Sequence, residues 1–294
     1  MCLSQVTHTG CLVNDMCNTL KIGGLQYIKV SSKGWHGWKD VKCADAFVDI
    51  DSWLAADEHQ IVLETPCRTI ARHPFSFNGE AINVYSKLMC AQNDGALKKH
   101  EILSLLKWAL GPSRAVRVLK TTSLMLEFGH LCPRPLLAVR HKMRSGHHLN
   151  LLVTAEVTAP TLESIIQQKA DDDARKAVIA AGHDLAKLHA DRFLHGDYLP
   201  RNTCLDGGKI VFLDNDKTSR WPIMPPFQLR RRNLEQFAYN LMLQKGLKEC
   251  KTELPTLFLD AYFEAAKRRD EERQKGIVLN KARARWENRR RRSM

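Results

Sequence analysis

The chain has 294 residues, of which 44% are hydrophobic and 26% are charged, a composition that predicts a globular protein with a buried core and excludes a largely disordered chain. No stretch approaches the roughly 18 apolar residues of a transmembrane helix, and the N-terminus lacks the apolar run of a signal peptide. The nine cysteines are scattered and form no C-x-x-C pair, which excludes a disulfide scaffold and indicates a reducing compartment. We therefore expect a cytoplasmic protein built as one two-lobed unit or two domains.

The net charge of +13 is concentrated near the C-terminus. Residues 267–294 hold twelve Lys or Arg and four acids, so this basic tail carries +8 and the rest of the chain +5. Such a tail suits an anionic surface, and Arg289–Arg292 are its densest part; phospholipid and phosphorylated glycolipid are favoured over nucleic acid, because only Trp286 supplies an aromatic ring there. The alternative is a solvated helix end that binds nothing specific.

The order of the predicted elements divides the chain into four parts. Residues 1–58 give no readable pattern and are treated as an N-terminal extension of uncertain structure. Residues 59–158 are strand-rich, with Asn78-Gly79 as a tight turn and Ser113 as a helix cap. The elements expected there are strands at 61–64, 69–71, 82–88, 136–139 and 151–154, and helices at 97–110 and from 114 to about 128. Residues 159–266 are mostly helical, and the basic tail, 267–294, follows.

The helical part contains one stretch whose polar residues stand at set offsets. It begins with His195-Gly196-Asp197, and Asn202 follows Asp197 by five residues. A second acid, Asp214, follows Asn202 by twelve residues. Between Asn202 and Asp214 lies Asp206-Gly207-Gly208, a turn signal flanked by two short apolar runs. A hairpin there would return the chain on itself, and we therefore expect Asn202 and Asp214 to lie close together.

Phosphoryl transfer needs a cluster of this kind. The transferred group carries charge on its equatorial oxygens, so catalysis consists mainly of positioning and electrostatic stabilisation. One carboxylate must accept or orient the proton of the acceptor hydroxyl, and hard oxygen ligands must hold Mg²⁺. One Asp, one Asn and a further Asp satisfy both needs.

This stretch resembles the protein-kinase-like superfamily, in which an H-x-D-x-x-x-x-N loop is followed by a hairpin and a metal-binding Asp. The His-Gly-Asp variant is shared by small-molecule kinases and by the lipopolysaccharide kinases that phosphorylate Kdo or heptose of the inner core. Three further segments are similar to the lipopolysaccharide kinases: 111–115 leading to 133–136, Leu213-Asp214-Asn215-Asp216-Lys217 with Arg220, and Arg230-Arg231-Arg232-Asn233-Leu234. The resemblance covers about residues 60–265.

The resemblance implies an α+β, protein-kinase-like fold with a strand-rich N-lobe and a helical C-lobe. It also implies ATP and Mg²⁺ as cofactors, and a role for each matching residue. Asp197 would be the catalytic base or hydroxyl-orienting residue, Asn202 and Asp214 would hold Mg²⁺, Lys87 would contact the ATP phosphates, and Ala155, Glu156 and Val157 would lie beside adenine.

Two departures from the superfamily pattern leave alternatives open. No G-x-G-x-x-G loop precedes Lys87, and the helix from Arg114 offers only the late Glu127 as an acidic partner for that lysine. A catalytically inactive pseudokinase that serves as a binding module is therefore one alternative. A soluble small-molecule or protein kinase is another, although no Ala-Pro-Glu segment follows Asp214. The leading hypothesis is an ATP-dependent kinase of a lipid-linked sugar, attached peripherally to the cytoplasmic face of the inner membrane.

Overall fold

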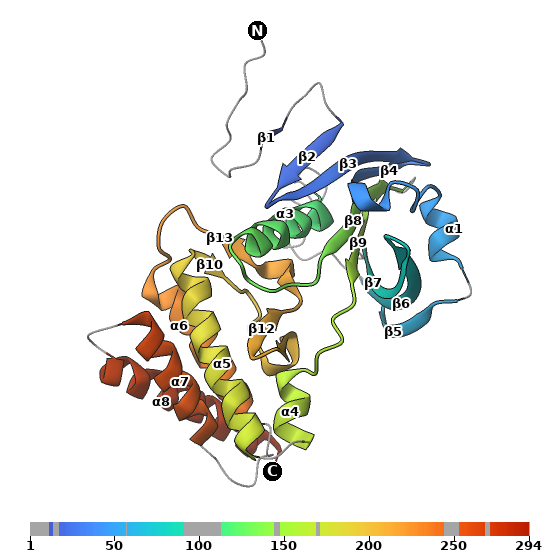
Figure 1. The fold of residues 1–294 in the computed structure, drawn as a ribbon. Coiled ribbons are helices and arrows are strands. Elements are labelled where there is room, and N and C mark those ends of the chain that lie inside the picture. Colours follow the sequence, from blue (N-terminus) through green and yellow to red (C-terminus); the bar gives the residue numbers. More distant parts are fainter. Residues whose placement is uncertain are drawn as a thin grey trace, which may run out of the picture. The chain divides into compact units, whose positions relative to one another are not determined.

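The structure is a computed structural model that describes residues 12–13, 18–56, 58–90, 113–143, 148–168, 171–243, 253–267 and 271–293. The helix expected at 97–110 lies outside these ranges. The chain divides into two compact units (Figure 1). Unit 1 comprises residues 1–127 and 133–156, and unit 2 comprises residues 128–132 and 157–294. None of the helices within the described ranges is both long enough and apolar enough to cross a bilayer.

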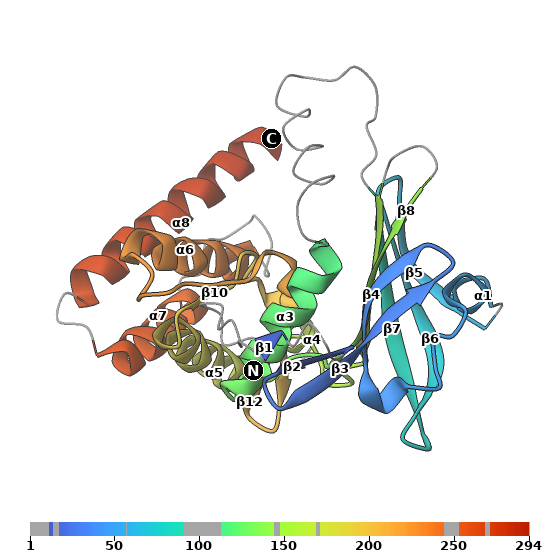
Figure 2. The same cartoon turned by 90° about the horizontal axis from the view of Figure 1, so that it is seen from above.

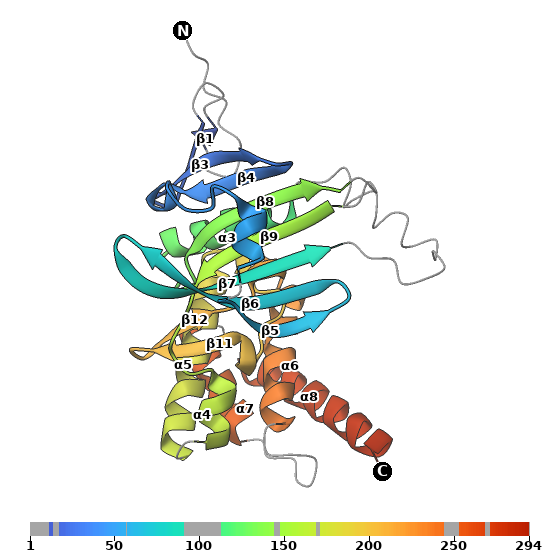
Figure 3. The same cartoon turned by 90° about the vertical axis from the view of Figure 1, so that its right-hand side faces the viewer.

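Unit 1 is built on one antiparallel sheet, whose strands follow the order β1-β2-β3-β4-β8-β9-β7-β6-β5. Figure 3 shows β8, β9, β7, β6 and β5 side by side. The strands are β1 (Leu12–Val13), β2 (Thr19–Ile22), β3 (Leu25–Ser32), β4 (Trp35–Asp40), β5 (Gln60–Thr65), β6 (Arg68–Phe77), β7 (Glu80–Cys90), β8 (Pro135–Lys142) and β9 (His148–Ala155). The turn between β6 and β7 is the predicted Asn78-Gly79, and both residues have positive φ, 53° and 82°, which suits a two-residue hairpin turn.

A helix covers each face of this sheet (Figure 2). On one face, α3 (Arg114–Glu127) buries Ala115, Val118 and Leu119 against the sheet residues Ala138 and Leu152. On the other face, α1 (Ile50–Leu54) and the preceding Phe47 pack over alternate residues of the same strands, among them Val84, Leu151 and Val153. Because side chains alternate across a strand, the two apolar clusters lie on opposite sides of one sheet.

The division of the chain differs from the sequence-based one at the N-terminus. Residues 1–58 gave no readable pattern in the sequence, and their described part contributes β2, β3, β4 and α1 to unit 1. The register of β4 with β8 joins Gly37 to Val139 and Trp38 to Ala138. This pairing bridges about a hundred residues of sequence and joins β2, β3 and β4, which carry the buried Tyr27 and Trp35, to the rest of the sheet.

Unit 2 is mainly helical. Its helices are α4 (Leu162–Gln168), α5 (Asp171–Ala190), α6 (Phe227–Leu243), α7 (Glu253–Ala266) and α8 (Glu271–Ser293), and its short strands are β10 (Phe193–Leu194), β11 (Thr203–Asp206), β12 (Lys209–Phe212) and β13 (Ser219–Arg220). Helix α5 carries an apolar stripe that is fully buried and includes Val178 and Leu185. Strands β11 and β12 form the predicted hairpin, and β10 pairs with β13.

The basic tail is a helix that packs against unit 2. Helix α8 runs beside α6 (Figure 3) and buries Val278, Ala282 and Trp286, which are at most 3% exposed. These residues are spaced four apart, so they form one stripe on the helix. One stripe of α8 is therefore packed against the rest of unit 2 as far as Trp286, whereas residues 287–292 extend beyond this stripe and are exposed.

Candidate active site

The loop between β10 and β11 is held in place by the buried ring of His195. Its Nε2 donates to the carbonyl of Leu213 at 2.9 Å, and its Nδ1 accepts from the backbone N–H of Asp197 at 3.3 Å. Burial lowers the pKa of His195, which agrees with a neutral ring that donates from one nitrogen and accepts at the other. His195 therefore ties the backbone at Asp197 to the residue that precedes Asp214.

The hairpin brings the second and third predicted site residues together. Thr203 pairs with Phe212, and the N–H of Leu213 donates to the carbonyl of Asn202 at 2.9 Å. The side chain of Asn202 donates through Nδ2 to the carbonyl of Asp197 at 2.9 Å. Its Oδ1 is thus turned away from that bond. Four hydrogen bonds therefore join His195, Asp197, Asn202 and Leu213, the residue before Asp214, within unit 2.

Gly196 explains the His-Gly-Asp variant in physical terms. A Cβ at this position would lie 2.2 Å from the Cβ of Lys217 and 2.5 Å from its carbonyl oxygen. Real Cβ atoms do not approach backbone so closely, so only glycine fits. The loop between β10 and β11 is therefore packed directly against the short 3₁₀ turn Asn215–Lys217 that follows Asp214.

Asp214 is exposed and has a left-handed backbone, with φ 50° and ψ 54°. A non-glycine residue in this region stores strain, which is typical of functional sites. The neighbouring Asn215 is buried and holds the turn, because its Nδ2 donates to the Phe212 carbonyl at 3.1 Å and its Oδ1 accepts from Thr218 at 3.3 Å. The strained residue is thus supported on both sides.

The described residues contain no cluster of three or more His, Cys, Asp or Glu side chains that could hold a metal ion by themselves. The predicted ligands, Asn202 and Asp214, are one amide and one carboxylate. That donor set fits Mg²⁺ bound together with a nucleotide, since Mg²⁺ keeps several waters and takes further oxygens from phosphates. Cys204, two residues after Asn202, is buried, and burial raises the pKa of its thiol to about 11. A protonated thiol is a poor ligand for Mg²⁺.

A chain of buried polar side chains supports the loop from below. Asn233 on α6 donates through Nδ2 to the His195 carbonyl at 2.5 Å. Its Oδ1 therefore faces His189 Nε2, at 3.0 Å, and His189 Nδ1 accepts from the Tyr262 hydroxyl at 2.9 Å. Burial lowers the pKa of His189 to about 3, so this ring is neutral. Helices α5, α6 and α7 are thereby joined to the loop between β10 and β11.

Two further residues reach the loop that the sequence did not single out. Gln236 on α6 donates through Nε2 to Oδ1 of Asp197 at 3.1 Å. Tyr198 is fully buried, stacks on Phe237 with ring centroids 4.7 Å apart, and donates to the carbonyl of Ala181 at 2.9 Å. Gln236 carries no sequence signal for its contact with Asp197, because only the packing of α6 brings the two together.

The remaining predicted residues, except Val157, belong to unit 1. Lys87 lies on β7 opposite Leu152 of β9, on the sheet face that α3 covers. The only acid on α3 is Glu127, which is exposed at the end of the helix beside Gly23. Glu127, in the last turn, is therefore the one residue of α3 that could serve as an acidic partner for Lys87.

The predicted adenine-side segment is partly committed to other bonds. The N–H of Ala155 donates to the Arg134 carbonyl and that of Glu156 to the Asn83 carbonyl, both at 2.9 Å. The Glu156 carboxylate is held by Arg72 at 2.8 and 2.9 Å and by Asn83 at 2.9 Å, and the bond to Arg72 lowers the pKa of Glu156. The backbone N–H groups of Ala155 and Glu156 are therefore already engaged within unit 1.

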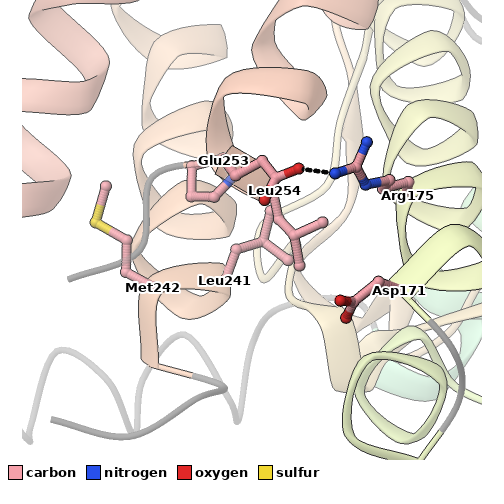
Figure 4. Close-up of a pocket in the computed structure, with 7 residues that line it drawn as sticks. Asp171, Arg175, Leu241, Met242, Glu253 and Leu254 are labelled. Carbon is pink, nitrogen blue, oxygen red and sulfur yellow. Dashed lines mark hydrogen bonds and ion pairs between the residues drawn. The ribbon is translucent and has the colours of Figure 1, made fainter. Parts of the chain in front are cut away.

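A small cavity of about 80 Å³ lies elsewhere in unit 2, between the first turns of α5 and α7 and the end of α6 (Figure 4). An ion pair between Arg175 and Glu253 lines it, together with Met242. Pockets for nucleotide-sized ligands are typically several hundred Å³, so this cavity is too small to be the nucleotide site.

The fold and the loop together define the class of the protein. An antiparallel sheet with a flanking helix, followed by a helical unit that carries an H-G-D-x-x-x-x-N loop and a hairpin, is a kinase-like α+β fold. No protein-family model matches the chain, and no curated protein matches it by sequence. Among solved structures, the chain is similar to WaaP in complex with acyl carrier protein, with a TM-score of 0.56 and 15% identity over 82% of this chain and 92% of that chain. At this identity the likeness establishes the fold alone.

Proposed function

We propose that the chain is an ATP-dependent phosphotransferase whose acceptor is a sugar hydroxyl, Kdo or heptose, of inner-core lipopolysaccharide. The observation that carries the proposal is the set of hydrogen bonds that joins Asp197 and Asn202 to each other and to Leu213, the residue before Asp214. Such a cluster has little value as a stability device, because Asp214 is strained and exposed. It has a clear value as a fixed set of oxygen ligands beside a carboxylate.

Each residue has a proposed role. Asp197 accepts or orients the proton of the acceptor hydroxyl, and Gln236 fixes one of its oxygens so that the other faces the acceptor. Asn202 and Asp214 would hold Mg²⁺, which would neutralise charge on the phosphates of bound ATP, and ATP would supply the γ-phosphoryl group. Lys87 would contact the ATP phosphates. His195 would have a structural role, because both of its ring nitrogens are engaged, one by the carbonyl of Leu213 and the other by the N–H of Asp197.

The acceptor class rests on the sequence resemblance to the lipopolysaccharide kinases and on charge. Arg230, Arg231 and Arg232 lie in the first turns of α6, close along the chain to Gln236, which contacts Asp197. Guanidinium groups are well shaped to bind carboxylate and phosphate groups of an anionic sugar. The exposed Arg289–Arg292 would favour an anionic membrane, so the proposed place of action is the cytoplasmic face of the inner membrane.

The test is a phosphotransfer assay with purified protein, Mg²⁺ and ATP, with and without a deacylated inner-core fragment, alongside Asp197→Ala and Asp214→Ala. Phosphate on the sugar that disappears in both variants supports the proposal. ATP turnover without sugar phosphorylation would keep the kinase and replace the acceptor by a small molecule or a protein. Absence of both ATP binding and turnover would leave the pseudokinase alternative.

A further inference from the structure

An exposed apolar surface lies in unit 2 between β13 and the first turn of α6. We call residues 221–229 the apolar loop. Ile223 is 71% exposed, Met224 47% and Leu229 38%. These are three of the eight large hydrophobic side chains that are exposed in the described part of the chain, and they fall within seven residues. Single exposed apolar side chains need no explanation, whereas a cluster of them marks a contact surface.

Hydrogen bonds fix the backbone of the apolar loop at its base. Arg192 exchanges two bonds with it: its carbonyl accepts from the N–H of Trp221 at 2.8 Å, and its guanidinium donates to the carbonyl of Pro222 at 2.5 Å. Arg230 donates to the carbonyl of Pro225 at 3.0 Å and lies over the Phe227 ring. The loop is therefore fixed at both ends, and the exposure of its tip is a property of the folded unit.

The surroundings of the apolar loop are positively charged. Residues 217–232 contain five Lys or Arg and no acid, and Arg192 adds a sixth positive charge at the base of the loop. Arg231 is neutralised by its ion pair with Glu235, but Lys217 and Arg232 are exposed. This arrangement matches the layers of an anionic bilayer surface. The apolar side chains at the tip would face the acyl chains, the Trp at the base would lie at the interface, and the surrounding cations would face the headgroup phosphates.

The apolar loop is also linked directly to the catalytic loop. Strand β13 ends where the apolar loop begins, and it pairs Ser219 with Leu194, the residue before His195. A lipid-linked acceptor held in a bilayer at the apolar loop would thus lie next to the strand pair that leads into His195 and Asp197. We propose that residues 221–229 form the membrane-contacting surface of this protein and insert Ile223 and Met224 into anionic bilayers. This inference deepens the proposed function and rests on it for its purpose.

The inference assigns different parts to the loop and to the tail. Residues 287–292 of α8 are exposed and carry no large apolar side chain, so they can attract a membrane only through charge. Attraction of that kind is screened by salt. Insertion of apolar side chains survives salt, and this difference separates the two surfaces experimentally.

The experiment is vesicle sedimentation of the full chain, without nucleotide, on phosphatidylcholine vesicles with and without phosphatidylglycerol. The variant is Ile223→Asp combined with Met224→Asp, and the matched control is Val48→Asp, which changes a 70% exposed apolar residue in unit 1. We expect the wild type to bind the anionic vesicles and to keep most of this binding at high salt. The loop variant should bind at least about tenfold more weakly than the wild type. Two apolar side chains would no longer enter the bilayer, and two negative charges would be repelled by the anionic surface. The Val48→Asp variant should bind like the wild type.

Either of two results overturns the inference: no binding of the wild type to anionic vesicles, or equal binding of the wild type and the loop variant. Loss of binding upon Arg290→Gln, Arg291→Gln and Arg292→Gln at high salt would also overturn it, because the tail would then be the anchor. Phosphotransfer by the wild type to a soluble, deacylated fragment is measured separately. Transfer without vesicle binding refutes only the membrane surface, and vesicle binding without transfer refutes only the proposed function.

Discussion

Replacement of Asn233 by Leu tests whether the buried polar chain supports the catalytic loop. Asn233 is 4% exposed and makes two bonds, to the His195 carbonyl at 2.5 Å and from His189 Nε2 at 3.0 Å. Leucine has a similar volume and can make neither bond, so one carbonyl and one ring N–H remain buried without partners. A change of tautomer in His189 moves the unpaired group but does not remove it.

The magnitude follows from these two groups. An unsatisfied buried donor or acceptor costs about 1–3 kcal/mol, so the two groups left by Asn233→Leu should lower the free energy of unfolding by about 2–6 kcal/mol. The matched control is Asn240→Leu on the same helix. Asn240 is half-buried and makes one local bond, to the Gln236 carbonyl at 2.8 Å, so its loss should cost less than about 1 kcal/mol.

The assay is urea unfolding of both variants, followed by circular dichroism and analysed by the midpoint and the slope. If Asn233→Leu costs no more than Asn240→Leu, the buried chain does not carry the stability that its geometry indicates. The reasoning about loop support would then be refuted, whatever the activity of the variant.

Three further predictions follow from single contacts. Gln236→Leu should lower the turnover number about tenfold to a hundredfold with little change in the urea midpoint, since a bond to a charged group is worth about 1.5–3 kcal/mol; an unchanged turnover would exclude a role in positioning Asp197. The pKa of His189 is lowered from 6.5 to about 3 by burial, so the unfolded chain binds a proton that the folded chain does not. His189 therefore costs no stability above pH 6.5. As the pH falls from 6.5 toward 3, the free energy of unfolding should decrease by about 1.4 kcal/mol per pH unit because of this residue. Urea midpoints should consequently fall less steeply over this pH range in His189→Gln than in the wild type. Trp286→Ala should cost about 3–5 kcal/mol because this α8 side chain is buried against the rest of unit 2, and a cost near zero by thermal unfolding would show that this packing does not stabilise the unit.

The elements that could be predicted from the sequence are those formed by local signals. Asn78-Gly79 requires positive φ at two adjacent residues, and the structure has a tight turn there. Ser113 accepts from the N–H of Val116 at the start of α3, as a cap should. The hairpin after Asn202 was predictable for the same reason, because Gly207 and Gly208 both adopt positive φ.

The elements that could not be predicted depend on distant partners. Strands β2 and β3 meet at Gly23-Gly24, a visible turn signal, but their place in the sheet is set by β4 pairing with β8 far along the chain. Helix α8 carries its apolar stripe at intervals of four residues, yet the surrounding charge concealed it. The contact of Gln236 with Asp197 arises only from the packing of α6 against the loop.

The central claim is that the loop cluster of unit 2 transfers phosphate to a sugar hydroxyl. The most direct measurement is the ³¹P spectrum and mass of a deacylated inner-core fragment after incubation with Mg²⁺, ATP and the wild type, Asp197→Asn or Asp206→Asn. Asp206 is a matched control, because it is exposed at the tip of the β11–β12 hairpin. The account predicts a phosphorylated sugar with the wild type and Asp206→Asn and none with Asp197→Asn. An unmodified fragment in all three reactions, or equal phosphorylation in all three, would contradict it.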